Sequence, residues 1–221
     1  NSFSASINYD HPAKNYIFGF TLEGFYTTLN DVFFLAPLGE DEFGERFEKQ
    51  NGNTARVQGI IVEARANYKK KIQIETGFNI QSSRYNDAIE VFDGLPSTRK
   101  FLRTPNQYGF ANLNFRPNQK FKSSFSYVYT GPMKLLHLAG APEQSIDAFF
   151  TSNSFSELSF KTSYNFSLKN TTAKLQIFGG IKNILDAYQK DFDSGKNRDS
   201  NYIYGPAMPK TAFLGLKISS F

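Results

Sequence analysis

One stretch decides the fold: L-S-F-K-T-S-Y-N-F-S-L, at residues 158–168. Its large apolar side chains fall on alternate positions, with only Thr162 interrupting the row, and they are Leu158, Phe160, Tyr164, Phe166 and Leu168. Polar residues occupy the positions between them. A period of two predicts a β-strand with one apolar and one polar face. In a soluble sandwich the apolar face would pack on a second sheet, and in a membrane barrel it would meet lipid.

The same alternation recurs along the chain and predicts an all-β fold. The further strands are expected at 3–9, 16–22, 60–68, 72–80, 108–115, 121–130 and 175–183, with a terminal strand after Tyr202, which makes about nine in all. Segment 108–115 is the least regular of them. There Tyr108 and Phe110 have the opposite parity to Ala111, Leu113 and Phe115.

The connections between these strands alternate between short and long. Tight turns are expected at 11–14, 69–71, 116–119 and 169–171, and long loops at about 30–55, 83–105, 131–154 and 184–202. Outer-membrane barrels have short turns at one end and long loops at the other. Strands of about ten residues, tilted near 45°, would rise about 23 Å, close to the apolar band of such barrels. The pattern therefore favours an antiparallel transmembrane β-barrel.

Aromatic residues gather at the short-turn ends of the expected strands. They are Tyr9, Tyr16, Tyr68, Phe115, Phe121 and Phe166. Barrels carry girdles of aromatic side chains where the membrane meets water. We therefore expect these residues to form one interfacial girdle.

Composition excludes several classes of protein. The 221 residues include no Cys, which excludes disulfide and thiolate-metal scaffolds. The mean hydropathy is −0.43, and no apolar run reaches the roughly 18 residues of a membrane-spanning helix. The net charge of +5 gathers at turns, so no nucleic-acid partner is expected. Ser, His and carboxylate residues do not group as in a hydrolase, and we expect no enzyme activity.

The C-terminal segments resemble a known family. The sequence G-G-I-K-N-I-L-D-A-Y-Q-K-D-F-D occupies 179–193, and R-D-S-N-Y-I-Y-G-P-A-M-P-K-T-A-F-L-G-L-K occupies 198–217. Together they resemble the end of TonB-dependent outer-membrane receptors, particularly the Bacteroidetes type. The resemblance is sharp over about the last forty residues and only architectural upstream.

The resemblance implies a larger protein than this chain. Receptors of this kind are 22-stranded, plugged barrels. Residues 1–221 would be the C-terminal part of such a barrel, with the plug and the N-terminal strands outside this chain. The expected number of strands, about nine, is odd, whereas single-chain bacterial barrels have even numbers of strands. Upstream strands are therefore expected.

The implied function is import across the outer membrane of a Gram-negative bacterium. The expected substrate is a large scarce nutrient, a ferric siderophore above all, and TonB would energise its uptake. The expected partners are TonB, through the missing N-terminal region, the barrel-assembly machinery, outer-membrane lipid and a small-molecule or chelate ligand, with no cofactor and no resident metal. A passive porin or adhesion barrel and a soluble β-sandwich carbohydrate-binding domain remain alternatives.

Five residues in the long loops are candidates for contact with substrate. They are Arg99, Arg103, Arg198, Tyr202 and Tyr204. Arginine would pair with an anionic metal chelate, and tyrosine would stack on a flat or sugar-like ligand. The alternative is that these side chains only brace the loops.

Other loop residues suggest metal or haem ligation more weakly. Asp191, Asp193, Asn197 and Asp199 alternate around Gly195 like the oxygen ligands of a calcium loop, but Lys196 stands where that motif has Gly. The expectation is therefore a polar loop. The acidic residues Glu40, Asp41, Glu42 and Glu45 could chelate divalent ions or simply be solvated. His137 is placed where it could touch haem, whereas His11 sits at a tight turn and could not.

The last residue, Phe221, is a candidate assembly signal. Terminal aromatic residues of outer-membrane barrels are read by the insertion machinery. Phe213 and Phe221 share one parity, while Leu214, Leu216 and Ile218 share the other. We therefore expect either a bulge that resets the register or a frayed end. An ordinary strand at a chain end is the alternative.

Overall fold

The computed structural model describes residues 1–52, 54–167 and 173–219. Within these ranges the chain is all β-structure, antiparallel throughout its named strands. None of the described residues forms a helix long and apolar enough to cross a membrane.

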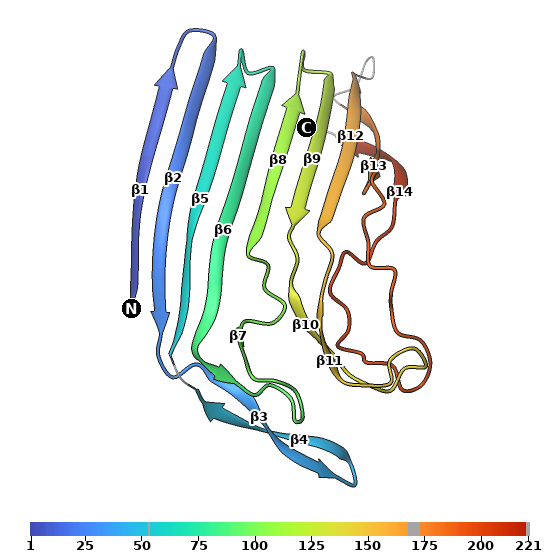
Figure 1. Ribbon diagram of the computed structural model, residues 1–221. Helices are drawn as coiled ribbons and strands as arrows, with labels where there is room; N and C mark the ends of the chain where they lie inside the picture. The colour runs from blue at the N-terminus through green and yellow to red at the C-terminus, as the bar shows by residue number, and fades with distance from the viewer. Residues whose placement is uncertain (53, 168–172, 220–221) are drawn as a thin grey trace.

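Nine strands form one continuous sheet (Figure 1) in the order β1-β2-β5-β6-β8-β9-β12-β13-β14, as the alternation predicted. A short strand, β7, pairs beside β6, and β3 with β4 and β10 with β11 form separate two-stranded sheets. The bounds are β1 Ser2–Pro12, β2 Tyr16–Leu29, β3 Phe33–Asp41, β4 Gly44–Asn51, β5 Ala55–Tyr68, β6 Ile72–Ile89, β7 Thr98–Lys100, β8 Gln107–Phe115, β9 Phe121–Thr130, β10 Lys134–His137, β11 Ala148–Thr151, β12 Phe155–Ser167, β13 Lys174–Lys182 and β14 Thr211–Ser219.

The pairing register gives the sheet one apolar and one polar face. One row of paired residues crosses the sheet through Phe18, Ala66, Ile74, Leu113, Phe125, Phe160 and Ile181. The two faces of the sheet differ because side chains at successive positions of a strand point to opposite faces. A row of the other parity runs through Asn8, Thr21 and Glu63. We call the first surface the apolar face and the second the polar face. Of the stretch that predicted this pattern, Leu168 lies outside the described residues.

The two ends of the sheet differ as the sequence predicted. In Figure 1 the short turns lie at the top and the long connections at the bottom. The connections β1–β2, β5–β6 and β8–β9 are tight, whereas those after β2, β6, β9 and β13 are long. The predicted turn at 169–171 lies outside the described residues.

Three long connections hold more β-structure than expected, and the predicted loop at 131–154 is one of them, because it contains the hairpin β10–β11. Segment 30–55 was expected to be a loop, but it contains the hairpin β3–β4, which a turn with Phe43 N donating to Asp41 Oδ1 at 2.8 Å closes. The acidic residues belong to this hairpin, where Asp41 forms an ion pair with Arg46 at 3.6 Å. The predicted loop at 83–105 is also wrong in part, because β6 continues to Ile89 and pairs with β7. Backbone pairing in a solvated ribbon needs no apolar alternation, so the sequence pattern predicted neither the hairpin β3–β4 nor the pairing of β6 with β7.

The residues of the predicted aromatic girdle share one face at the short-turn end of the sheet, and their place at a membrane interface stays a prediction. Tyr16 pairs with Tyr68, Tyr68 with Ile72, and Ile72 with Phe115, so these side chains share the apolar face at the short-turn end. Tyr9, Phe121 and Phe166 lie on the same face near the same end, where they pair with Phe20, Tyr164 and Leu175. Phe115 and Phe121 also meet edge to face with ring centroids 6.3 Å apart.

The mixed parity of residues 108–115 has a packing reason. β8 is regular, so Tyr108 and Phe110 point to the polar face while Leu113 and Phe115 point to the apolar face. The Phe110 ring lies over its register partner Gly77, where an added Cβ would come within 2.7 Å of the ring. Glycines opposite aromatic residues are covered in this way elsewhere in the sheet, at Phe25–Gly59, Phe78–Gly109, Phe178–Gly215 and Phe213–Gly180.

The last strand keeps one register. β14 pairs with β13 from Thr211 to Ser219 without a shift, so the expected bulge does not occur there. Leu214, Leu216 and Ile218 lie on the apolar face, and Phe213 covers Gly180 on the polar face. Phe221 lies outside the described residues, and its role as an assembly signal stays a prediction.

The turn between β5 and β6 is built from residues that do not favour its backbone conformation. Lys69 and Lys70 have φ of 50° and 57°, in the left-handed region, and Asn-Gly adopts these values at lower cost than Lys-Lys. We predict that replacing Lys69-Lys70 with Asn-Gly raises the stability of the intact protein by about 1 kcal/mol. Urea unfolding in detergent micelles measures this, and an unchanged or lower midpoint would contradict the argument.

Candidate functional site

The candidate site lies at the long-loop end, where residues 183–205 fold back onto the polar face. Gly205 lies against Phe155 at the start of β12, where an added Cβ would be 2.6 Å from the ring. Phe155 has the parity of the polar face, like Glu157 and Ser159. Asn183 N donates to Ser159 Oγ at 3.2 Å at the base of the same segment. We call residues 183–205 the inner loop.

An apolar cluster joins the inner loop to the hairpin β10–β11. Leu135 is 1% exposed and Tyr202 4% exposed, and they pack with Met133, Phe150 and Tyr204. The ring of His137 stacks on Tyr202 with centroids 3.5 Å apart and planes 2° from parallel. Segments far apart in sequence are therefore held as one unit over the polar face.

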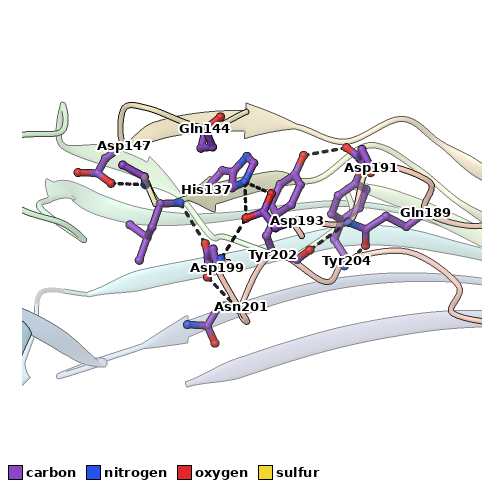
Figure 2. Close-up of polar contacts among 12 residues, drawn as sticks. His137, Gln144, Asp147, Gln189, Asp191, Asp193, Asp199, Asn201, Tyr202 and Tyr204 are labelled. Carbon is purple, nitrogen blue, oxygen red and sulfur yellow. Dashed lines mark hydrogen bonds and ion pairs between the residues drawn. The ribbon is translucent and has the colours of Figure 1, made fainter. Parts of the chain in front are cut away.

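Three aspartates of the inner loop accept hydrogen bonds from these segments (Figure 2). Asp191 accepts from the hydroxyls of Tyr202 and Tyr204, at 2.9 and 2.7 Å. Asp193 accepts from His137 Nε2 at 2.9 Å and from Asp199 N at 3.0 Å. Asp199 in turn accepts from Leu138 N at 3.0 Å. The carboxylates that alternate like calcium ligands thus hold the chain's own donors, and the described residues contain no group of three or more His, Cys, Asp or Glu side chains suited to a metal ion.

Two amides complete the inner loop, and sequence reasoning missed both. Gln189 is 1% exposed, donates to Tyr202 O at 3.0 Å and accepts from Tyr204 N at 2.8 Å. Asn183 donates to Ala187 O and Met208 O and accepts from Ala187 N. Each satisfies backbone groups that the loop would otherwise bury without partners. A single amide in a polar loop carries no periodic signal by which it could have been found.

The five predicted substrate residues do not form one cluster. Arg103 donates both guanidinium ends to backbone carbonyls of the inner loop, those of Asn201 and Ile203, so it is joined to Tyr202 and Tyr204. Arg198 donates to Gly195 O within its own loop, at 3.2 Å. Arg99 lies apart on β7, where it lines two cavities of about 670 and 510 Å³. Bracing accounts for the contacts of Arg103, Tyr202 and Tyr204, and their contact with substrate stays a prediction.

A smaller cavity of about 370 Å³ opens beside the inner loop. His137, Asp191 and Asp193 line it, together with Phe150 and Lys190. The ring of His137 is already hydrogen-bonded to Asp193 and stacked on Tyr202. His11 lies on β1 and stacks on Tyr16, with ring centroids 5.9 Å apart.

The tyrosine pair predicts a spectroscopic signature. Burial and the hydrogen bond to Asp191 raise the pKa of Tyr204 to about 12, and the same causes raise the pKa of Tyr202 further. Because the folded pKa is raised, the protonated phenols stabilise the loop fully below the ordinary pKa of 10, and this contribution is lost as the pH rises through about 12. We predict that Tyr202 and Tyr204 contribute to the tyrosinate absorbance of the intact protein only well above pH 10. Asp191→Asn should move both toward pH 10, and an unchanged titration in that variant would refute the assignment.

The sheet and loops together define a section of barrel wall with an apolar outer face and loops folded over its inner face. Residues 1–184 match the model of the family "TonB dependent receptor-like, beta-barrel". The chain belongs to this family of transport receptors, whose barrels lie in the outer membrane of Gram-negative bacteria. Most of the C-terminal motif that suggested the family lies beyond the matched residues, and the Bacteroidetes type stays a prediction.

Solved structures of outer-membrane receptors have the same fold. The ferric-catecholate import receptor Fiu from Escherichia coli K12 has a TM-score of 0.62 at 17% identity, and the siderophore receptor PiuA from Acinetobacter baumannii has 0.64 at 14%. The copper transporter OprC has 0.63 at 12%. All of this chain is covered in each match, but it spans only 27%, 28% and 31% of those proteins. The comparison with curated protein sequences found no match.

Proposed function

We propose that this chain is the C-terminal part of an outer-membrane active transporter that binds a ferric siderophore and imports it with energy from TonB. Membership of the receptor family over residues 1–184 is the observation that carries the proposal. A plug domain and further strands would precede the chain in the intact protein, in keeping with the share of the similar structures that it spans.

The inner loop supports a role in receiving substrate. It lies on the polar face at the long-loop end, which faces the outside of the cell in barrels of this kind. Its apolar cluster and the Asp191 network fix it in one position, and pre-organised loops bind ligands with a smaller loss of conformational entropy. Arg103, Tyr202 and Tyr204 would act by holding this loop at the entrance, and Arg198 would present a cation to the substrate.

A metal chelate is the substrate class that we favour. Arginine pairs with anionic oxygens in a bidentate way, and aromatic rings stack on flat ligands. Two of the similar structures are named as a ferric-catecholate import receptor and a siderophore receptor, and a third as a copper transporter. Iron chelates are therefore the first substrates to test and copper the second.

Uptake by whole cells tests the proposal. Native cells with the gene of the intact protein deleted, and the same cells carrying it on a plasmid, would be given radioactive iron bound to catecholate or hydroxamate siderophores. We expect saturable uptake that requires the gene and is abolished when TonB is deleted or the proton gradient is collapsed. Uptake that persists without TonB and rises linearly with concentration would identify a passive porin instead. TonB-dependent uptake of copper alone would overturn the siderophore assignment.

A further inference from the structure

Four cations gather on the outer face of the sheet, at its long-loop end. Arg56 pairs with Arg84 across β5 and β6, and Arg84 pairs with Lys100 of β7. The side chains of all three are exposed. Lys134 lines the same cavity of about 670 Å³ as Arg84, Arg99 and Lys100. We call Arg56, Arg84, Lys100 and Lys134 the outer basic patch.

The register places the patch on the apolar face. Arg56 stands four residues from Ile60 on β5, and Arg84 four residues from Ile80 on β6, so each shares the face of its apolar neighbour. Ile60 and Ile80 are paired, and each is 54% exposed. At about 3.3 Å per residue, the cations lie roughly 13 Å beyond these isoleucines. Only one polar row, Gln58 and Ser82, separates the two.

Lys134 joins the patch from the neighbouring hairpin. Met133 and Leu135 face the apolar cluster of the inner loop, so Lys134 between them points the other way. Its Nζ lies 2.9 Å from Thr98 Oγ1 and 3.6 Å from the centre of the Phe149 ring. Partial burial and the charge of Lys100 lower the pKa of Lys134. The site thus holds cations close together at an energetic cost.

The patch lacks an anionic partner within the described part of the chain. The cavities that its members line, of about 670 and 510 Å³, have no Asp or Glu among their described lining residues. The ion pairs of the described residues involve Arg46, Arg65 and His137, none of which belongs to the patch. Cations gathered without carboxylates attract an external anion, and guanidinium groups favour the oxygens of phosphate.

We propose that the outer basic patch binds the phosphate groups of a lipid headgroup in the outer leaflet of the membrane. The lipid's acyl chains lie along Ile60, Val62, Phe78 and Ile80, which are exposed on the same face, and its phosphates meet Arg56, Arg84, Lys100 and Lys134. An amphiphile fits this surface because the apolar band and the cations follow one another along the same strands. A soluble substrate does not, since the inner loop lies on the opposite face. Arg99 lines both cavities and adds a fifth positive charge beside the patch.

Lipid binding to the intact protein tests the proposal. The purified protein would be placed in nanodiscs of zwitterionic phospholipid containing a diphosphorylated glucosamine lipid, and in matched discs with the dephosphorylated form. Native mass spectrometry would count the glycolipid that stays bound. We expect selective retention of the phosphorylated form, and a loss of about tenfold in affinity or more for the double variant Arg56→Gln with Arg84→Gln.

The controls separate the possible sources of phosphate and the possible reasons for a loss. Lys122→Gln changes an exposed cation of the polar face on β9 and should leave retention unchanged. Each variant's heat-modifiable gel shift shows whether it folds, and Arg84→Lys with Arg56→Lys should retain part of the binding if the double Gln variant does not fold. Equal retention of both glycolipids, equal loss in Lys122→Gln, or displacement by millimolar inorganic phosphate or by a soluble ferric chelate would overturn the proposal.

Discussion

Gly109→Ala should destabilise the barrel strongly. Gly109 lies between Phe78 and Tyr129 in the register, and the rings of these two residues stack across it with centroids 6.1 Å apart. An added Cβ would lie 2.6 Å from the Phe78 ring and 2.6 Å from the carbonyl oxygen of Gly77. Because the carbonyl is backbone, relief requires the strands to move apart. We expect a loss of about 2 to 3 kcal/mol in the free energy of unfolding.

Gly24→Ala is the matched control. Gly24 lies on the same apolar face, between Ala5 and Ile60, and a Cβ there would meet no atom within 4 Å. Replacing glycine by alanine should be neutral or slightly stabilising at that position, because alanine loses less conformational entropy on folding. Urea unfolding of the intact protein in micelles measures both variants. Equal unfolding midpoints for the two variants would contradict the argument that packing across Gly109 excludes a larger side chain at that position.

Arg103→Ala should release the inner loop. The guanidinium of Arg103 donates to the carbonyls of Asn201 and Ile203, about 100 residues away in sequence. Hydrogen bonds from a charged group contribute about 1.5 to 3 kcal/mol. If local opening controls proteolysis, trypsin should cleave after exposed Lys196 about tenfold faster or more in this variant. Ferric siderophore affinity should fall with it, if the inner loop receives substrate as proposed.

Arg99→Ala is the control that distinguishes the loss of the Arg103 hydrogen bonds from the loss of a positive charge. Arg99 is exposed on β7, only four positions before Arg103, and within the described part of the chain it forms no hydrogen bond or ion pair with residues 199–203. Its loss should leave the rate of cleavage after Lys196 unchanged. Faster cleavage in Arg99→Ala, or an unchanged rate in Arg103→Ala, would contradict the assigned role of the guanidinium as a clamp.

The alternation of residues such as Leu158, Phe160 and Tyr164 was enough to predict the nine-stranded sheet, its two faces and the side of the sheet on which the aromatic residues of the short-turn end lie. Strand pairing follows from such a pattern because a register slip of one residue would turn the whole apolar row to the wrong face. The hairpin β3–β4 escaped prediction because nothing in it alternates. Phe110 looked irregular because its ring covers Gly77 on the neighbouring strand, a contact that no local sequence pattern reveals.

The site was predicted less completely than the fold. Arg103, Tyr202 and Tyr204 were found as residue types suited to binding, and the alternative of bracing was stated with them. The hydrogen-bond partners of Tyr202 and Tyr204 could not be predicted from spacing. Asp191 and Gln189 reach the two tyrosines only through the fold of a loop without regular structure. Arg99 was grouped with them because both segments are long loops. The pairing of β6 with β7 instead associates it with cations of the outer face.

The central claim is that one face of this sheet meets lipid and the other lines the barrel. Single cysteines carrying a nitroxide label can be introduced along β12, from Leu158 to Tyr164, in a form of the intact protein that has no other cysteine and is placed in bilayers; residues 1–221 contain none to be replaced. The account predicts that collisions with oxygen peak at Leu158, Phe160, Thr162 and Tyr164, and that collisions with a water-soluble nickel chelate peak at Ser159, Lys161 and Ser163. The same accessibility to both reagents at all positions would contradict it.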